Sequence, residues 1–214
     1  MSEFVSAVSV QTMRESDLWT SEHRIPSRLL MDRAGTAIFQ AADWIPPVAI
    51  FCGSGNNAGD GYVATIRMKE AGIPCTLVRV SDRCSTDGGY YYRECLQSKI
   101  PEIRFSPDFC ISAFGSVLDC LLGTGFAGKI DGIMRQAIEL INRSNLYVVS
   151  ADINSGLNGD TGLSDCCVHS DLTVSIGMFK TGHFSGISNE VMKKRINCDI
   201  GIEIIGPIIQ MPVV

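Results

Sequence analysis

The sequence predicts an α/β fold with a mostly parallel central sheet, and three observations carry this prediction. Short apolar segments alternate with amphipathic segments along most of the chain, as strands and crossover helices do. Glycine-rich stretches follow several of the apolar segments, where strand-to-helix turns are expected. The 214 residues are 45% hydrophobic and 19% charged, which is typical of one globular domain. We therefore expect residues 1–214 to form a single domain.

The first half of the chain is expected to begin with two amphipathic helices. The first falls over 11–23, and the second runs from Ser27, its expected cap, to about Ala42. The apolar run Val48–Cys52 then predicts a buried strand, followed by a glycine-rich turn over 53–61. The elements expected next are a helix over 62–71, a strand over 75–80 and a helix over 86–98.

The second half repeats this alternation. Its expected elements are strands over 116–119, 146–150 and 171–176, a helix over 131–142, and loops over 123–129 and 152–162. The run Lys193-Lys194-Arg195 is interpreted as the solvated end of a helix. Right-handed crossovers between such strands give a parallel sheet.

The charge balance argues against a nucleic-acid partner. There are 18 basic and 23 acidic residues, a net charge of −5, with no basic cluster beyond the short run at 193–195. The first ten residues lack a basic region and carry Glu3, so they do not resemble a signal peptide. No apolar stretch is long enough to span a bilayer, and we expect no membrane association.

The nine cysteines indicate a reducing compartment. Their number is odd, no CxxC pair occurs, and several lie within apolar runs where reduced thiols pack as small hydrophobes. Cys166 and Cys167 lie near His169, but their spacing fits no zinc pattern. We expect a cytoplasmic protein with free thiols.

Three loops should meet at one edge of the sheet, and each carries glycines and a carboxylate. In a doubly wound sheet, ligands bind outside the carboxyl ends of the strands, where the loops 53–61, 119–129 and 152–162 are expected. Their carboxylates belong to Asp60, Asp119 and Asp152. This convergence predicts the ligand site.

The first loop has two interpretations. Its glycines have the spacing G-x-G-x-x-x-G, which departs from the dehydrogenase fingerprint. Backbone N–H groups at the start of the following helix could hold a phosphate. Alternatively, the loop is only a tight turn in which Asp60 favours the helix N-terminus.

Three further side chains suggest a cation site. Asn57, Asp119 and Ser155 offer only oxygen donors and one formal charge, which suits a hard, weakly charged ion better than zinc or calcium. Such an ion would relieve the repulsion between clustered carboxylates and an anionic ligand. The alternative is that Asp119 and Ser155 only hydrogen-bond loop backbone.

Together these motifs resemble the signatures of the YjeF N-terminal family. The main motifs are GSGNNAGDG at 53–61, DCLLGTG at 119–125 and DINSGLNGDTG at 152–162. Supporting matches are LMDRAG at 30–35, the stretch 177–182 around Lys180, and DIGI at 199–202. The likeness covers nearly the whole chain in order, and it implies a Rossmann-like three-layer fold.

The resemblance implies an NAD(P)HX epimerase, an isomerase that interconverts the R and S forms of hydrated NADH or NADPH for metabolite repair. It implies a bound potassium ion, held by Asn57, Asp119 and Ser155. It also implies a homodimer whose functional partner is a separate NAD(P)HX dehydratase. The residues expected to contact the dinucleotide are Asn56, Asn57, Ala58, Gly59, Asp60, Gly123, Thr124, Gly125, Phe126, Ala127, Gly128, Lys129 and Asp152.

Two positions depart from the family pattern. Asn154 stands where the family usually has proline, and we expect its loss to loosen the turn that presents Asp152 and Ser155. Ala58 replaces a common glycine, which is harmless if the residue lies at the start of the helix. Neither change removes a reacting group.

Two other functions can be weighed against the epimerase. A non-catalytic ligand-binding or interaction module of the same fold should have lost the loop carboxylates and asparagines, which this chain keeps. An NAD(P) dehydrogenase would need a better dinucleotide fingerprint and a separate substrate domain, for which 214 residues leave little room.

Asp152 is the expected acid–base residue. The reacting carbon carries a hydroxyl beside the ring nitrogen, which can expel it to leave an iminium-like centre. One carboxylate could protonate the departing hydroxyl and deprotonate the returning water. Lys180 is the alternative, although a cation would oppose the positive charge developing on the ring.

Overall fold

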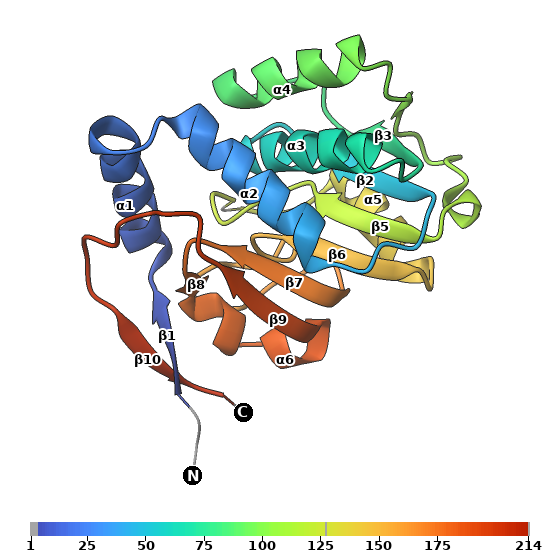
Figure 1. The fold of residues 1–214 in the computed structure, drawn as a ribbon. Helices are drawn as coiled ribbons and strands as arrows, with labels where there is room; N and C mark the ends of the chain where they lie inside the picture. Colours follow the sequence, from blue (N-terminus) through green and yellow to red (C-terminus); the bar gives the residue numbers. More distant parts are fainter. Residues whose placement is uncertain (1–3, 127, 214) are drawn as a thin grey trace.

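The structure, a computed structural model, describes residues 4–126 and 128–213. A seven-stranded sheet, all of whose neighbouring strands are parallel, forms its centre (Figure 1). In spatial order its strands are β4 (Glu102–Arg104), β3 (Cys75–Arg79), β2 (Val48–Cys52), β5 (Ser116–Cys120), β6 (Tyr147–Ala151), β7 (Ser170–Ile176) and β9 (Met192–Cys198). The predicted α/β class with a mostly parallel sheet is confirmed.

Helices cover both faces of the sheet. On one face lie α2 (Ser27–Ala41), α3 (Asn56–Glu70) and α4 (Thr86–Gln97), and on the other lies α5 (Gly132–Arg143). Strands β2 and β5 are buried along their whole length because helices cover them on both sides. Gly61 allows α3 to approach the sheet closely, since a Cβ there would lie 2.8 Å from the Cys120 sulfur.

A smaller sheet joins the two ends of the chain. It contains β1 (Phe4–Val8) between β10 (Ile209–Pro212), antiparallel to it, and β8 (Phe179–Lys180), parallel to it. Helix α1 (Val10–His23) follows β1 and lies beside α2 (Figure 1). The remaining elements are α6 (Ser188–Val191) and two short 3₁₀ turns, Ile111–Ala113 and Thr181–Phe184.

Several element boundaries differ from the prediction. Helix α3 begins at Asn56 rather than 62, so Gly59 and Gly61 serve helix packing and not a turn. Pro26 rather than Ser27 is the N-cap of α2, and the Ser27 hydroxyl donates to Asp87 instead, at 2.6 Å. The basic run at 193–195 lies in strand β9, not at a helix end.

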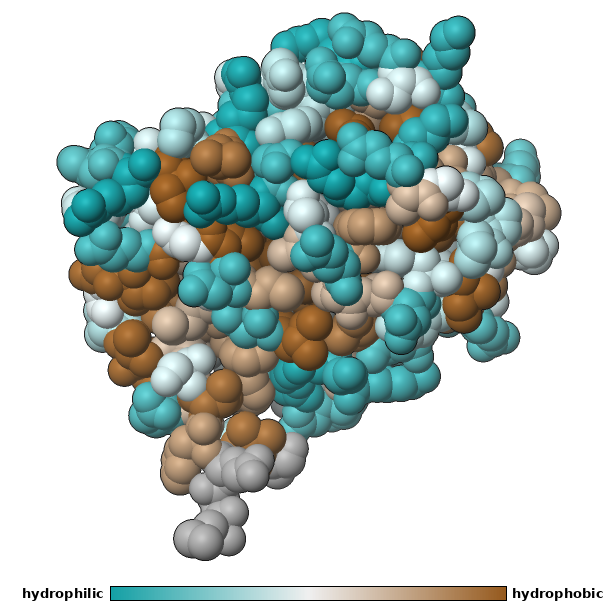
Figure 2. Space-filling view, in the orientation of Figure 1, coloured by the Kyte–Doolittle hydropathy of each residue, from teal (hydrophilic) through white to brown (hydrophobic). Residues whose placement is uncertain are grey.

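The surface has a mainly hydrophilic region and a more hydrophobic one. Figure 2 shows hydrophilic residues over α4 and a larger share of hydrophobic residues on the side where the first and last segments run. Exposed apolar side chains on these segments include Phe4, Leu18, Ile205, Ile208 and Ile209. In the described part of the chain, no helix is long and apolar enough to cross a membrane.

Candidate functional site

A cavity of about 540 Å³ lies at the carboxyl ends of the central strands. The chain enters the sheet at β2, runs outward to β4 and returns to β5 beside β2. The loops after β2 and β5 therefore diverge at this point, which is where doubly wound sheets bind ligands. Helices α1 and α2 and the segment 199–202 close the cavity from the other side.

One wall of the cavity is apolar. It is formed by Met13, Leu30, Met31, Ala34, Ile176, Ile200 and Ile202. Most of the polar lining, here called the polar wall, comes from the sheet loops and the first turns of α3, with Asn56, Asp60 and Asp152 among its residues. A flat ring can pack on the apolar wall while charged groups bind the polar one.

The first predicted loop contributes three of its five expected binding residues. Asn56, Asn57 and Asp60 line the cavity, and the free backbone N–H groups at the start of α3 lie beside it. Ala58 does not line it, since its side chain is 1% exposed and packs in the core. Gly59 faces α2 and α4, where a Cβ would meet Met31 and Gly88.

The second loop also brings only some of its expected binding residues to the cavity. Gly123, Thr124, Gly125 and Phe126 line the cavity. Ala127 lies outside the described residues. Gly128 and Lys129 are exposed and do not line the cavity. The part of the loop nearest the strand is therefore the part that the structure brings to the site.

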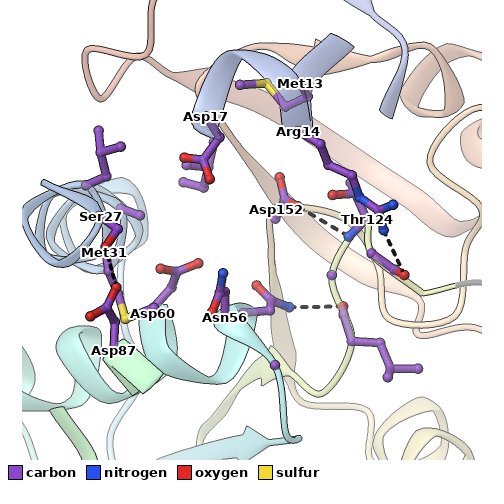
Figure 3. A pocket seen from close by; sticks show the side chains of 18 of the residues that line it. Met13, Arg14, Asp17, Ser27, Met31, Asn56, Asp60, Asp87, Thr124 and Asp152 are labelled. Atoms are coloured by element: carbon purple, nitrogen blue, oxygen red, sulfur yellow. Dashed lines mark hydrogen bonds between the residues drawn. The ribbon is translucent and has the colours of Figure 1, made fainter. Parts of the chain in front are cut away.

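Asp152 is held in place by an ion pair with Lys180. Its Oδ1 accepts from the Lys180 ammonium, and its Oδ2 accepts from the Thr124 N–H at 3.4 Å (Figure 3). The Lys180 side chain is 1% exposed and also donates to the Ile176 carbonyl at 2.9 Å. Burial is the largest single influence and raises the pKa of Asp152, but the charge and hydrogen bond of Lys180, together with His183 and the Thr124 N–H, hold this pKa below its ordinary value. Asp152 is therefore ionised at neutral pH.

His183 supports this pair and was missed in the sequence. Its Nδ1 accepts from the Lys180 backbone N–H at 3.0 Å, so its Nε2 carries the proton and donates to the Asp152 carbonyl at 2.9 Å. Burial and the nearby Lys180 charge lower the pKa of His183 to about 4. No motif signals this histidine, because it follows the last strong motif in an irregular segment.

The three residues predicted to bind a cation are linked by hydrogen bonds, and one of them, Asn57, lines the cavity. Asp119 and Ser155 are fully buried, and the Asp119 carboxylate accepts from the Ser155 side chain and N–H, from Ser150 and from the Leu121 N–H. The Ser155 hydroxyl accepts from the Leu122 N–H at 2.8 Å, and Asn57 donates to the Leu122 carbonyl at 3.0 Å. Within the described residues, the buried Asn57 Oδ1 has no hydrogen-bond partner.

Helix α1 supplies cavity residues that the motifs did not indicate. Met13, Arg14 and Asp17 line the cavity, and Arg14 donates to the Gly125 carbonyl at 3.1 Å. Figure 3 shows the side chains of Asp17, Asp60 and Asp152 directed into the cavity from three different elements. Burial and the charge of Asp152 raise the pKa of both Asp17 and Asp60. The only sequence signal for this helix was its amphipathic pattern.

Comparison with known proteins shows which family this chain resembles. The sequence profile of the family described as YjeF-related protein N-terminus matches residues 27–182. The chain is 31% identical over 206 residues to the NAD(P)H-hydrate epimerase of Lentilactobacillus buchneri, covering 92% of this chain and 94% of the relative. It is 35% identical over 185 residues to the Bifunctional NAD(P)H-hydrate repair enzyme Nnr of Methanothermobacter thermautotrophicus, covering 79% of this chain.

The fold is shared with a solved structure, and the lengths of the relatives differ. A crystal structure of the yeast protein ynu0 superposes with a TM-score of 0.74 at 18% identity, covering 96% of this chain and 99% of the yeast chain. The chain spans only 36% of the length of the bifunctional relative from Methanothermobacter. Because the profile matches most of the chain, including the cavity loops, this protein belongs to the YjeF-related protein N-terminus family.

Proposed function

We propose that this protein is an NAD(P)H-hydrate epimerase, which interconverts the R and S forms of NADHX and NADPHX. The observation that carries the proposal is the ionised Asp152 in a cavity that also holds the N-terminus of α3 and the 123–126 loop. Helix N-termini and glycine loops bind the phosphates of a dinucleotide. The apolar wall suits the nicotinamide ring, and Asp152 then lies within the same cavity as the reacting carbon.

The reaction requires proton transfer but no oxidant or reductant. Loss of the hydroxyl from the carbon beside the ring nitrogen leaves an iminium, and water adds back to that carbon. Asp152 can take the proton of the incoming water and return it to the leaving hydroxyl in the reverse step. The charge of Lys180 keeps Asp152 ionised and fixes its direction.

We further propose a potassium site at Asn57, Asp119 and Ser155. The free Asn57 Oδ1 and the nearby Leu122 carbonyl provide neutral oxygens, and the Asp119 carboxylate provides one negative charge. This donor set suits a large monovalent cation. When bound, potassium would offset the negative charge of the dinucleotide phosphates near α3.

We also propose the biological setting that the resemblance implies. A homodimer and a separate NAD(P)HX dehydratase as functional partner are the expected arrangement, and a bifunctional repair enzyme is among the relatives. The nine cysteines are all unpaired, which supports a reducing, cytoplasmic location.

Conversion of a purified epimer tests the proposed activity. Pure S-NADHX is incubated with the protein in potassium buffer, and the two epimers are separated by chiral chromatography over time. We expect interconversion well above the rate in buffer alone. Folded protein that gives no acceleration would favour a non-catalytic binding module.

The potassium proposal has a readout that does not depend on activity. Raising potassium at constant ionic strength, with sodium as the balancing ion, should raise the melting temperature, because a ligand that binds the native state stabilises it. Asn57→Ala should abolish this increment, whereas Asn142→Ala, which lies outside the cavity, should keep it. Equal melting temperatures in potassium and sodium for the wild-type protein would contradict the site.

A further inference from the structure

Epimerisation at one ring carbon imposes a geometric demand on the site. If water leaves from one face of the ring and returns on that face, configuration is retained. Inversion requires water to leave one face and to add to the other. A ring held in a fixed position therefore needs a proton-transferring group on each side. This reasoning depends on the proposed epimerase function.

Asp152 supplies such a group on one side only. It enters the cavity from the loop after β6, with Lys180 behind it. Asp60 enters from α3, and Figure 3 shows it on the side of the cavity away from Asp152, with Asn56 between them in this view. The two carboxyls are not hydrogen-bonded to each other, yet each is near enough for the charge of Asp152 to raise the pKa of Asp60. The two carboxyls therefore enter the cavity from different sides.

The position of Asp60 is fixed by the backbone rather than by a partner of its side chain. At Gly35 of α2, a Cβ would lie 2.4 Å from the Asp60 carbonyl oxygen, so α2 and α3 are in direct backbone contact there. Among the described residues, the Asp60 carboxyl has no hydrogen-bond or ion-pair partner. A carboxyl placed this firmly in a cavity and left without a partner is available to a ligand.

The surroundings push the two carboxyls toward opposite protonation states. Burial, Asp152 and Asp17 raise the pKa of Asp60 well above its ordinary range, and Lys180 offsets this only in part. The same lysine lowers the pKa of Asp152 against the effect of burial. Pairs of titratable groups whose pKa values are pushed apart in this way commonly act as acid and base.

We propose that Asp60 is a second catalytic residue, which transfers protons on the ring face opposite to Asp152. In one direction Asp60 donates its proton to the ring hydroxyl, the carbon–oxygen bond breaks, and water leaves as the ring nitrogen forms the iminium. A second water then adds to the other face and gives its proton to Asp152. In the reverse direction, Asp152 donates and Asp60 accepts.

Oxygen exchange can separate this two-residue scheme from one in which a single carboxylate serves both faces. Each pure epimer of NADHX is incubated in H₂¹⁸O with wild-type protein or Asp60→Asn, and both configuration and ¹⁸O content are followed by chiral chromatography with mass detection. We expect Asp60→Asn to lower epimerisation by roughly 10²–10⁴. The epimer whose hydroxyl faces Asp152 should still incorporate ¹⁸O with retained configuration, while the other epimer should not.

Two results would overturn the proposal. One is epimerisation by Asp60→Asn at the wild-type rate. The other is an equal loss of ¹⁸O exchange from both epimers, which would make Asp60 a binding residue. Asp82→Asn is the matched control, because Asp82 is exposed and paired with Arg104 outside the cavity. Thermal denaturation verifies folding, with Asp60→Ala as a second variant. Failure of the wild-type protein to epimerise would instead refute the proposed function.

Discussion

Asp152 combines an unusual backbone conformation with an unusual charge state. Its φ of 62° lies in the left-handed region, which is uncommon for a residue other than glycine. The conformation is stabilised by the Asp152 N–H donating to the Val174 carbonyl at 2.8 Å and by the bond from His183 to the Asp152 carbonyl. Strained residues of this kind often serve a site, because the fold orients their side chains.

Replacement of Asp152 should separate catalysis from stability. Asp152→Asn leaves the buried Lys180 ammonium without a counter-charge, so we expect lower stability as well as a loss of roughly 10²–10⁴ in rate. The double variant Asp152→Asn/Lys180→Met removes both charges and should recover stability without recovering rate. Chiral turnover assays and thermal denaturation measure the two effects. Near-wild-type turnover by either variant would reassign Asp152 to binding.

His183 should make stability depend on pH. Its pKa is about 4 in the folded protein and about 6.5 when unfolded, so between these values the unfolded state binds more protons. Stability from this residue is therefore complete above pH 6.5 and is lost as pH falls, by on the order of 3 kcal/mol at pH 4. Asp17 and Asp60 have the opposite effect on stability, which they lower as pH rises, because their pKa values are raised in the folded protein.

The contribution of His183 is isolated by comparison with His183→Asn, whose side-chain oxygen can still accept from the Lys180 N–H. Urea denaturation at intervals from pH 7 to pH 4 should show a steeper loss of stability for the wild-type protein than for the variant. Parallel curves would mean that His183 is protonated as easily in the folded as in the unfolded protein.

At the scale of elements, the loop 152–162 is fixed by side chains and not by a proline. Asn154 is fully buried, donates to the carbonyls of Val168 and Val191, and accepts from Ser170 and Thr173. We expected asparagine at this position to loosen the turn, and that expectation is wrong. The four hydrogen bonds replace the restraint that a fixed φ would provide.

Asn154→Ala should therefore destabilise the protein strongly. Two carbonyls and two hydroxyls would lose their buried partner, which we expect to cost about 2–4 kcal/mol in the free energy of unfolding. Asn158 of the same loop is the control, because its bonds to the N–H groups of Asp160 and Thr161 are exposed and water can replace them. Urea denaturation compares the two variants. Equal small losses would show that the buried network contributes little.

Asp160 connects this loop to helix α1. Its Oδ1 accepts from the Val10 N–H at 2.7 Å, at the first residue of the helix, and α1 carries Met13, Arg14 and Asp17 into the cavity. Loss of such a helix-terminal bond costs about 0.5–2 kcal/mol. Asp160→Ala should therefore raise KM for NADHX and speed hydrogen exchange in α1, with little change in kcat. Glu15→Ala, on the exposed side of α1, should leave both unchanged, and a fall in kcat alone would contradict this assignment.

The sequence predicted the regular elements of the main sheet better than those at its margins. The strands at 48–52, 116–120, 147–151 and 170–176 are short segments rich in apolar residues and are almost entirely buried, so their pattern is strong. Strands β1, β4, β8, β9 and β10 were not predicted, because they are short or largely exposed, and most of them depend on partners distant in the sequence. The start of α3 was placed too late, since its asparagines and glycines are typical of a turn.

The same limit applies to the candidate site. Asp119 lies near the end of β5, while Asp60, Asp152 and Ser155 come after β2 or β6, and their convergence could be predicted from the parallel topology. Asp17 and His183 could not, since they come from elements whose place is set by tertiary contacts. Family membership was indicated by the motifs, and the profile match confirms it.

At the scale of the whole molecule, the two ends of the chain close the cavity together. The segment 199–205 crosses the N-terminal helices, where the N–H groups of Glu203 and Ile205 donate to Thr20 and Ser16 of α1. Ile200 and Ile202 of this segment complete the apolar wall. Beyond it, β10 returns to pair with β1 (Figure 1). Substrate binding should thus depend on a segment outside the profile match.

Two truncations separate these contributions. A chain ending at residue 207 lacks β10 but keeps the apolar wall, so we expect a lower melting temperature with nearly unchanged affinity for NADHX. A chain ending at residue 198 also loses Ile200, Ile202 and the two bonds to α1, so affinity should fall at least tenfold. Full burial of an isoleucine contributes about 1.5–3 kcal/mol, and Ile200 is buried while Ile202 is partly buried, so a tenfold loss, about 1.4 kcal/mol, is expected.

The measurements for both truncated chains are thermal denaturation and equilibrium binding of NADHX below the melting temperature. Ile208→Ser serves as a control for the loss of exposed apolar surface, because Ile208 is 51% exposed and lies outside the cavity. Equal affinities for the chains ending at 198 and 207 would show that residues 199–205 stabilise α1 without forming part of the binding site. A lower affinity for the shorter chain alone would place these residues in the binding wall, so that both ends of the chain act on one ligand.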